Sequence, residues 1–129
     1  MVWVTAVVLV AILQYIALGM WVGFSRGRYG IPAPATTGHP TFERLFRAHA
    51  NTLEMLIAFI PGIWLYGWWV SQTWATALGL VFIAARVLYV IQYVRDPRTR
   101  EIGASLSFLV IIILIVGDLY AVARLVLTR

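Results

Sequence analysis

The sequence contains no cysteine and no lysine, and only five of its 129 residues are acidic. Without cysteine the chain has no disulfide, no thiolate metal site and no thiol nucleophile, so any thiol chemistry must use a thiol that a substrate brings. The net charge of +5 therefore comes from arginine alone. Several arginines lie beside or inside apolar blocks, which disfavours nucleic acid as a partner.

Histidine is also scarce, and the two that occur are His39 and His49. Neither has a thiolate or a cluster of carboxylates beside it in the sequence. Because protein metal sites are built from several such ligands, we expect no metal.

Apolar residues, in contrast, make up 62% of the chain and fall into long blocks. Crossing the ~30 Å hydrocarbon core of a bilayer takes about 20 apolar residues in a helix. The first block lacks a basic leader and is too long for the apolar part of a signal peptide, which predicts a retained span. We expect one domain over residues 1–129, with spans at about 2–24, 43–69, 75–94 and 102–127. Short loops between spans predict an all-α integral membrane protein, an up-down four-helix bundle.

Arginine is distributed unevenly between the two sides of this bundle. Loops one and three and their flanks carry Arg26, Arg28, Arg44, Arg47, Arg95, Arg98 and Arg100. The second loop carries no charge. The positive-inside rule then places loops one and three in the cytoplasm and both termini outside. Arg44, Arg95 and Arg98 are expected to contact the headgroups of membrane lipids.

Polar residues continue into two of the predicted spans. Arg47, Asn51 and Glu54 recur at helical spacing on the second span and therefore share one face. The third span has a similar face, formed by Arg86, Tyr89 and Tyr93. Ionisable residues within a bilayer are costly, so they indicate a functional site.

Depth in the membrane relates the two faces. With a rise of 1.5 Å per residue, Glu54 and Arg86 both lie roughly 14–16 Å from the cytoplasmic ends of their helices. We therefore predict a structural ion pair between Glu54 and Arg86.

The side chains expected at this end suit a small zwitterion with several carboxylates and one ammonium group. Arginine binds carboxylate in bidentate fashion, and Glu54 would take the ammonium. Phosphate also suits the cations, but the sequence has no glycine-rich phosphate loop.

The motifs on these two faces resemble those of the MAPEG family, the membrane-associated proteins of eicosanoid and glutathione metabolism. The resemblance covers nearly the whole chain. The spacing from Arg86 to Arg100 resembles leukotriene C synthase and the type-two microsomal glutathione transferase, whereas Arg47-Ala48-His49-x-Asn51 is more similar to prostaglandin E synthase and the type-one transferase, so the chain combines both branches. The resemblance rests on the motif Glu43-Arg44-x-x-Arg47-Ala48-x-x-Asn51-x-x-Glu54, on Arg86-x-x-Tyr89-x-x-x-Tyr93 and on Arg100. The resemblance implies a homotrimer with a glutathione site at each subunit interface and a lipophilic small molecule in the apolar groove between subunits.

The resemblance also implies roles for individual residues. Glutathione, as co-substrate, would be bound by Arg47, Asn51, Glu54, Tyr89, Tyr93 and Arg100 of one subunit and by Arg26 and His49 of its neighbour. Arg100 matches the catalytic arginine that stabilises the thiolate. Because arginine stays protonated, that role is electrostatic and not that of a base.

Gly27, Thr52 and Met55 depart from the patterns of individual branches, which disfavours dedicated leukotriene or prostaglandin synthesis. The predicted function is a glutathione-dependent membrane transferase or peroxidase acting on a lipophilic electrophile or lipid hydroperoxide. The alternative is a non-catalytic lipid-binding scaffold of the same fold. Arg100 together with Tyr93 favours the enzyme. A transporter is less favoured, since Pro61-Gly62 is the single interruption that we find in the spans.

Overall fold

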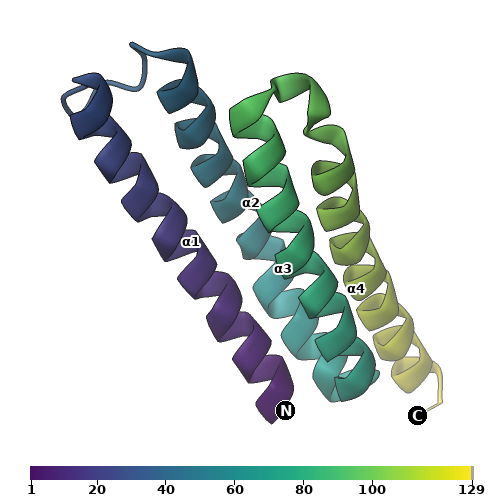
Figure 1. Ribbon diagram of the computed structural model, residues 1–129. Coiled ribbons are helices and arrows are strands. Elements are labelled where there is room, and N and C mark those ends of the chain that lie inside the picture. Colours follow the sequence, from purple (N-terminus) through teal and green to yellow (C-terminus); the bar gives the residue numbers. More distant parts are fainter. Residues whose placement is uncertain (129) are drawn as a thin grey trace.

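The computed structural model describes residues 1–128 as four long helices (Figure 1). They are α1 (Val2–Tyr29), α2 (Pro40–Trp69), α3 (Gln72–Arg95) and α4 (Glu101–Leu127), with a short 3-10 turn η1 (Pro97–Thr99) before α4. The helices run up and down, so that α1 begins and α4 ends at one end of the bundle. The α1–α2 loop and η1 lie at the other end, called here the loop end. The predicted all-α four-helix arrangement is confirmed.

Three of the four helices have the length and composition needed to cross a membrane. These are α1, α3 and the segment from Pro97 to the end of α4. The remaining helix, α2, is 30 residues long, but charged and amide side chains interrupt its first half. Its apolar content is lowered by the same residues that were predicted to form a site.

Helix α1 is longer than the apolar block that was predicted to span the membrane. The helix continues past residue 24 to Tyr29, so Arg26 and Arg28 lie in its last turn. Cations are favourable there because the C-terminus of a helix carries partial negative charge. Gly30 ends the helix with a φ of 64°, a left-handed conformation that glycine adopts without steric strain.

The main apolar core lies in the half of the bundle away from the loop end. All four helices contribute to it, with Val4 and Val7 from α1, Ile63 from α2 and Leu114 from α4 among its buried members. Phe59 of α2 and Phe82 of α3 stack there with ring centroids 3.8 Å apart. Since α2 and α3 each pack against both α1 and α4, the two helices with polar faces are the central ones (Figure 1).

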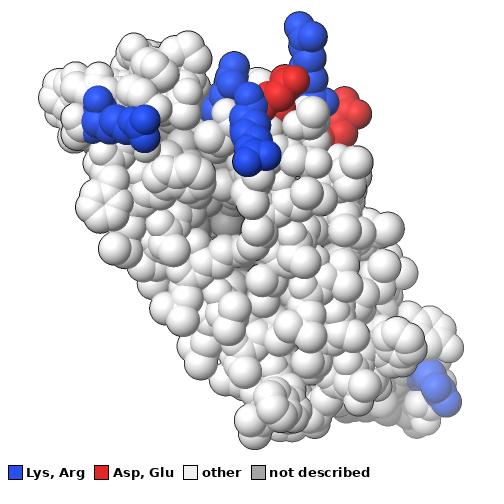
Figure 2. All heavy atoms as spheres, in the orientation of Figure 1, with Lys and Arg blue, Asp and Glu red and all other residues white. Residues whose placement is uncertain are grey.

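Charge gathers at the loop end of the bundle, as Figure 2 shows for one face. The flank below it is almost free of charge on that face. Large apolar side chains are exposed along the helices, for example Leu13, Ile57, Phe108 and Leu119. Such a lateral surface suits contact with lipid chains or with other apolar helices.

Candidate functional site

The polar face of α2 forms as predicted by helical spacing, and its charged members contact each other. The Nη1 atom of Arg47 lies 3.8 Å from Oε1 of Glu54, and the side chains are 61% and 57% exposed. These residues lie two turns apart on the same face of α2. A loose, exposed pair contributes little stability, so both groups are free to bind other partners.

Arg86 of α3 is 1% exposed and hydrogen-bonds to α2. Its Nη2 atom donates to Oδ1 of Asn51 at 2.9 Å and to Oγ1 of Thr52 at 2.8 Å. The predicted Glu54–Arg86 ion pair is therefore wrong for the described chain. Glu54 lies on the exposed side of α2 beside Arg47, whereas the buried Thr52 faces α3.

The two tyrosines predicted on α3 are buried between helices. Tyr89 and Tyr93 pack against Ala48 of α2, with their own ring centroids 5.6 Å apart. The guanidinium of Arg86 lies over the ring of Tyr89 at 4.2 Å, and that of Arg100 over the ring of Tyr93 at 5.2 Å. Cations at these distances are attracted to the face of the ring. Arg86, Tyr89 and Tyr93 thus form a row along α3 towards the loop end, and Arg100, at the start of α4, continues that row.

Arg100 reaches this row because α4 starts very close to α3. A Cβ atom placed on Gly103 would lie 2.6 Å from the backbone nitrogen of Tyr89. Only a glycine permits that approach. Sequence reasoning missed both Gly103 and the bond from Arg86 to Thr52. The presence of a glycine in the first turn after Arg100 was the signal in the sequence that could have indicated this close approach.

Arg26 and His49 lie apart from this row, where α2 meets α1. The guanidinium of Arg26 donates to the carbonyl of Ala35 at 2.6 Å and lies over the ring of Phe42. The ring of His49 stacks on that of Tyr15 with centroids 4.4 Å apart. Residues two apart on a helix point in nearly opposite directions, so His49 and the amide at position 51 do not face one ligand within a single chain.

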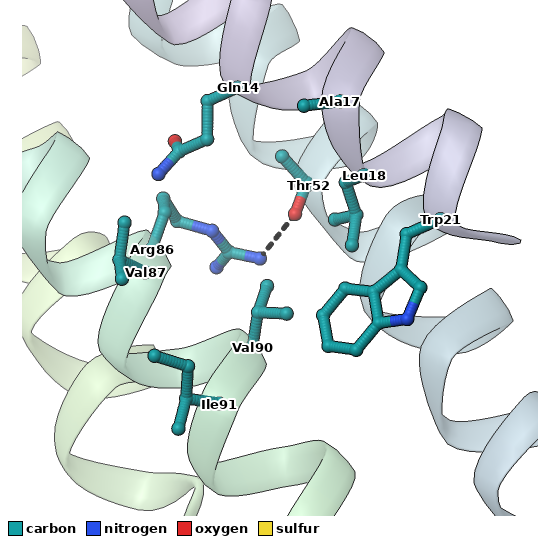
Figure 3. A pocket seen from close by; sticks show the side chains of 9 residues that line it. All are labelled: Gln14, Ala17, Leu18, Trp21, Thr52, Arg86, Val87, Val90 and Ile91. Atoms are coloured by element: carbon teal, nitrogen blue, oxygen red, sulfur yellow. Dashed lines mark hydrogen bonds between the residues drawn. The ribbon is translucent and has the colours of Figure 1, made fainter.

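A cavity of about 210 Å³ opens between α1 and α3 (Figure 3). Its lining residues are Gln14, Ala17, Leu18, Trp21, Thr52, Arg86, Val87, Val90 and Ile91. Figure 3 shows the Arg86 guanidinium lying across this space and directed at Thr52. The amide of Gln14 is held by a bond to the Ile83 carbonyl at 3.1 Å. Arg86 therefore separates a mostly apolar cavity from the polar face of α2.

Two cations, a carboxylate, an amide and a phenol thus lie along α2, α3 and the start of α4, from the loop end to the middle of α2. They are Arg47, Arg100, Glu54, Asn51 and Tyr93. This set can hold carboxylate and ammonium groups of a small molecule and can stabilise an anion near Arg100.

Comparison with known proteins agrees with the motif analysis. The sequence profile described as the MAPEG family matches residues 4–120. The chain belongs to the MAPEG family. With its three long apolar helices, this membership makes it an integral membrane protein.

Relatives within this family include proteins with and without an assigned activity. An uncharacterised protein of Synechocystis is 38% identical over 120 residues, which cover 93% of this chain and 88% of that protein. Human microsomal glutathione S-transferase 2 is 40% identical over 102 residues, which cover 79% and 69%. Bovine leukotriene C4 synthase is 32% identical over 95 residues, which cover 74% and 63%. The MAPEG resemblance inferred from the motifs is confirmed.

Proposed function

We propose that this protein is a glutathione-dependent membrane transferase or peroxidase. It would hold glutathione as a thiolate for attack on a lipophilic electrophile or a lipid hydroperoxide. The observation that carries the proposal is the placement of Arg100 over Tyr93, in line with Tyr89, Arg86 and Asn51. Similarity to microsomal glutathione S-transferase 2 and leukotriene C4 synthase supports glutathione as the thiol.

The loose pair of Arg47 and Glu54 suits the ends of the tripeptide. Glutathione carries two carboxylates and one ammonium group. Binding would replace the 3.8 Å contact between the two side chains, with Arg47 taking a carboxylate and Glu54 the ammonium. The charge-assisted bonds formed are stronger than the exposed pair that they replace.

Arg100 would act on the sulfur. A free thiol has a pKa near 8.5, and an adjacent cation lowers that pKa because it favours the thiolate. In conjugation, the thiolate forms a carbon–sulfur bond and the leaving group departs. In peroxide reduction, the oxygen–oxygen bond breaks, two glutathione molecules are oxidised to one disulfide, and the hydroperoxide is reduced to an alcohol and water.

We further propose a homotrimer in which Arg26 and His49 of one subunit complete the glutathione site of its neighbour. Their position apart from the α3 row is consistent with such sharing. The lipophilic substrate would lie in the apolar groove between subunits. Loops one and three would face the cytoplasm and the termini the outside, in keeping with the charge at the loop end (Figure 2).

An Arg100→Ala variant tests this function. Purified in detergent, it should conjugate glutathione to an aryl halide and reduce a lipid hydroperoxide on the order of 100-fold more slowly, because the thiolate loses its stabilising cation. Arg124→Ala, at the opposite end of α4, is the matched control and should keep full activity. Unchanged turnover in Arg100→Ala would contradict the assigned role.

The scaffold alternative makes a different prediction for the unaltered protein. A non-catalytic lipid-binding protein would not be stabilised by glutathione, whereas a ligand that binds the folded state raises its Tm. A Tm that does not respond to millimolar glutathione would therefore favour the scaffold.

A further inference from the structure

We propose that Arg86 and Thr52 are positioning residues, which fix the amide of Asn51 so that its Nδ2 atom donates to a carboxylate of the bound thiol tripeptide. This inference rests on the proposed function and adds to it. It assigns a task to a buried cation that has no carboxylate partner in the part of the chain that is described. Arg86 lies on α3 and Thr52 on α2, and in this proposal neither of them touches the ligand.

The hydrogen-bond directions follow from the chemistry of the three side chains. Thr52 donates its single hydroxyl hydrogen to the carbonyl of Ala48 at 2.8 Å, so its oxygen accepts from Arg86. Arginine has donors only. Asn51 must therefore present its oxygen, not its nitrogen, to the guanidinium. The oxygen and nitrogen of an amide have nearly the same shape, but the donor-only guanidinium decides which of them faces Arg86.

The guanidinium itself has little freedom to move. Arg86 and Thr52 are each 1% exposed, and the ring of Tyr89 lies against the guanidinium at 4.2 Å. One nitrogen, Nη2, carries two hydrogens and serves both acceptors on α2. These contacts hold the Asn51 oxygen towards α3.

The other end of the amide is then free for a ligand. Within residues 1–128, Nδ2 of Asn51 makes no hydrogen bond to another side chain or to the backbone. Asn51 is partly exposed and lies one turn from Arg47 on the same face. An N–H donor beside a guanidinium is suited to a carboxylate, whereas an amide turned the other way would present an oxygen and repel it.

Thr52→Val and Thr52→Ser test the proposal as a pair. Valine keeps the shape of threonine but removes the acceptor for Arg86, which frees the amide to turn. Glutathione affinity, measured by titration calorimetry on the assembled protein, should fall about tenfold in Thr52→Val, the equivalent of one hydrogen bond. The kcat at saturating glutathione should change little, and Thr52→Ser should restore the affinity.

Glutathione analogues separate positioning from general damage. Two analogues are needed, one with the glycine carboxylate esterified and one with the glutamyl α-carboxylate amidated. Positioning predicts that one of the two loses its sensitivity to Thr52→Val, because its altered group no longer accepts from Asn51. An equal loss for glutathione and both analogues would overturn the inference, as would unchanged affinity in Thr52→Val.

Asn51→Asp covers the case in which Thr52→Val fails to fold. Aspartate keeps an acceptor for Arg86 but replaces Nδ2 with an oxygen. The Tm should be preserved while glutathione affinity falls by more than tenfold, and retained affinity would overturn the inference. Wild-type protein that binds no glutathione would overturn the proposed function itself. Binding by the wild type with no effect of any variant would overturn the inference alone.

Discussion

Arg47 and Asn51 lie one turn apart on α2, but the structure gives them different freedom. Arg47 is largely exposed and held by one loose contact to Glu54. Asn51 is tied to a buried guanidinium at 2.9 Å. We expect the Arg47 side chain to change position when it binds a carboxylate. The Asn51 amide should already be held in place before the ligand binds.

Alanine substitution at these two positions should chiefly weaken glutathione binding. Arg47→Ala removes a hydrogen bond between two charged groups, whereas Asn51→Ala removes one in which the ligand carboxylate alone is charged. Glutathione KM should rise roughly tenfold or more in both variants, with a smaller effect on kcat. Steady-state kinetics with varied glutathione measures this. Unchanged affinity in both variants would place the site elsewhere.

At this scale the sequence predicted which residues share a face but not how they pair. Spacing along α2 and α3 follows directly from helical periodicity. Estimating depth placed Glu54 and Arg86 at the same level, but depth does not say which side of α2 faces α3. That direction depends on how the two helices are rotated about their axes, which packing decides. Thr52, which looked like a mere departure from the family pattern, is the residue that faces Arg86.

Helix α4 is the element that brings Arg100 to the row on α3. Its first turn approaches α3 at Gly103, where a side chain would meet the backbone of Tyr89. Backbone atoms cannot move aside as the tip of a flexible side chain can. The start of α4 and the position of Arg100 therefore depend on one missing Cβ atom.

Gly103→Ala should separate α4 from α3 and weaken both stability and turnover. Overpacking of this kind destabilises by about 1–3 kcal/mol, and displacing Arg100 should lower kcat. Gly23→Ala is the matched control, since a Cβ atom there would have nothing within 4 Å. Thermal unfolding and conjugation rates in detergent report both effects. Equal behaviour of the two variants would show that the close approach does not matter.

The helices themselves were predictable from the apolar blocks, but their ends were less so. Charge marks where a chain leaves the membrane, not where a helix stops. Helix α1 accordingly continues through Arg26 to Tyr29. The approach at Gly103 could not be predicted, because it depends on which helices are neighbours.

At the scale of the whole molecule, the bundle has an apolar flank and one strongly charged end (Figure 2). A site completed by Arg26 and His49 of a neighbouring subunit would use both features, since the flank would pack against another copy. The trimer and the orientation in the membrane stay predictions. The shared site can be tested by combining two site variants, and the orientation can be tested with the site residues unchanged.

Mixed trimers test whether the site is shared. Arg26→Ala and Arg100→Ala subunits, each expected to be poorly active alone, are co-expressed and purified together. If each site takes Arg100 from one subunit and Arg26 from the next, about a quarter of the sites in a random mixture are complete. Conjugation should then recover to about that fraction of wild type. Activity no higher than the mean of the two variants would contradict a shared site.

The absence of cysteine makes orientation directly measurable. Thr36→Cys, in the exposed α1–α2 loop, and Thr73→Cys, exposed at the opposite end, each introduce the sole thiol. A maleimide that cannot cross membranes should label Thr73→Cys in intact cells and label Thr36→Cys only after permeabilisation. The reverse pattern would place loops one and three outside.

The central claim is that this chain binds glutathione and holds it as a thiolate through Arg100. The most direct measurement is the ultraviolet absorption of the thiolate when glutathione is added to the purified protein near pH 7. The wild type should show thiolate absorption that saturates with glutathione, and Arg100→Ala should bind glutathione with most of that absorption lost. Equal thiolate absorption in the two proteins, or none in the wild type, would contradict the account.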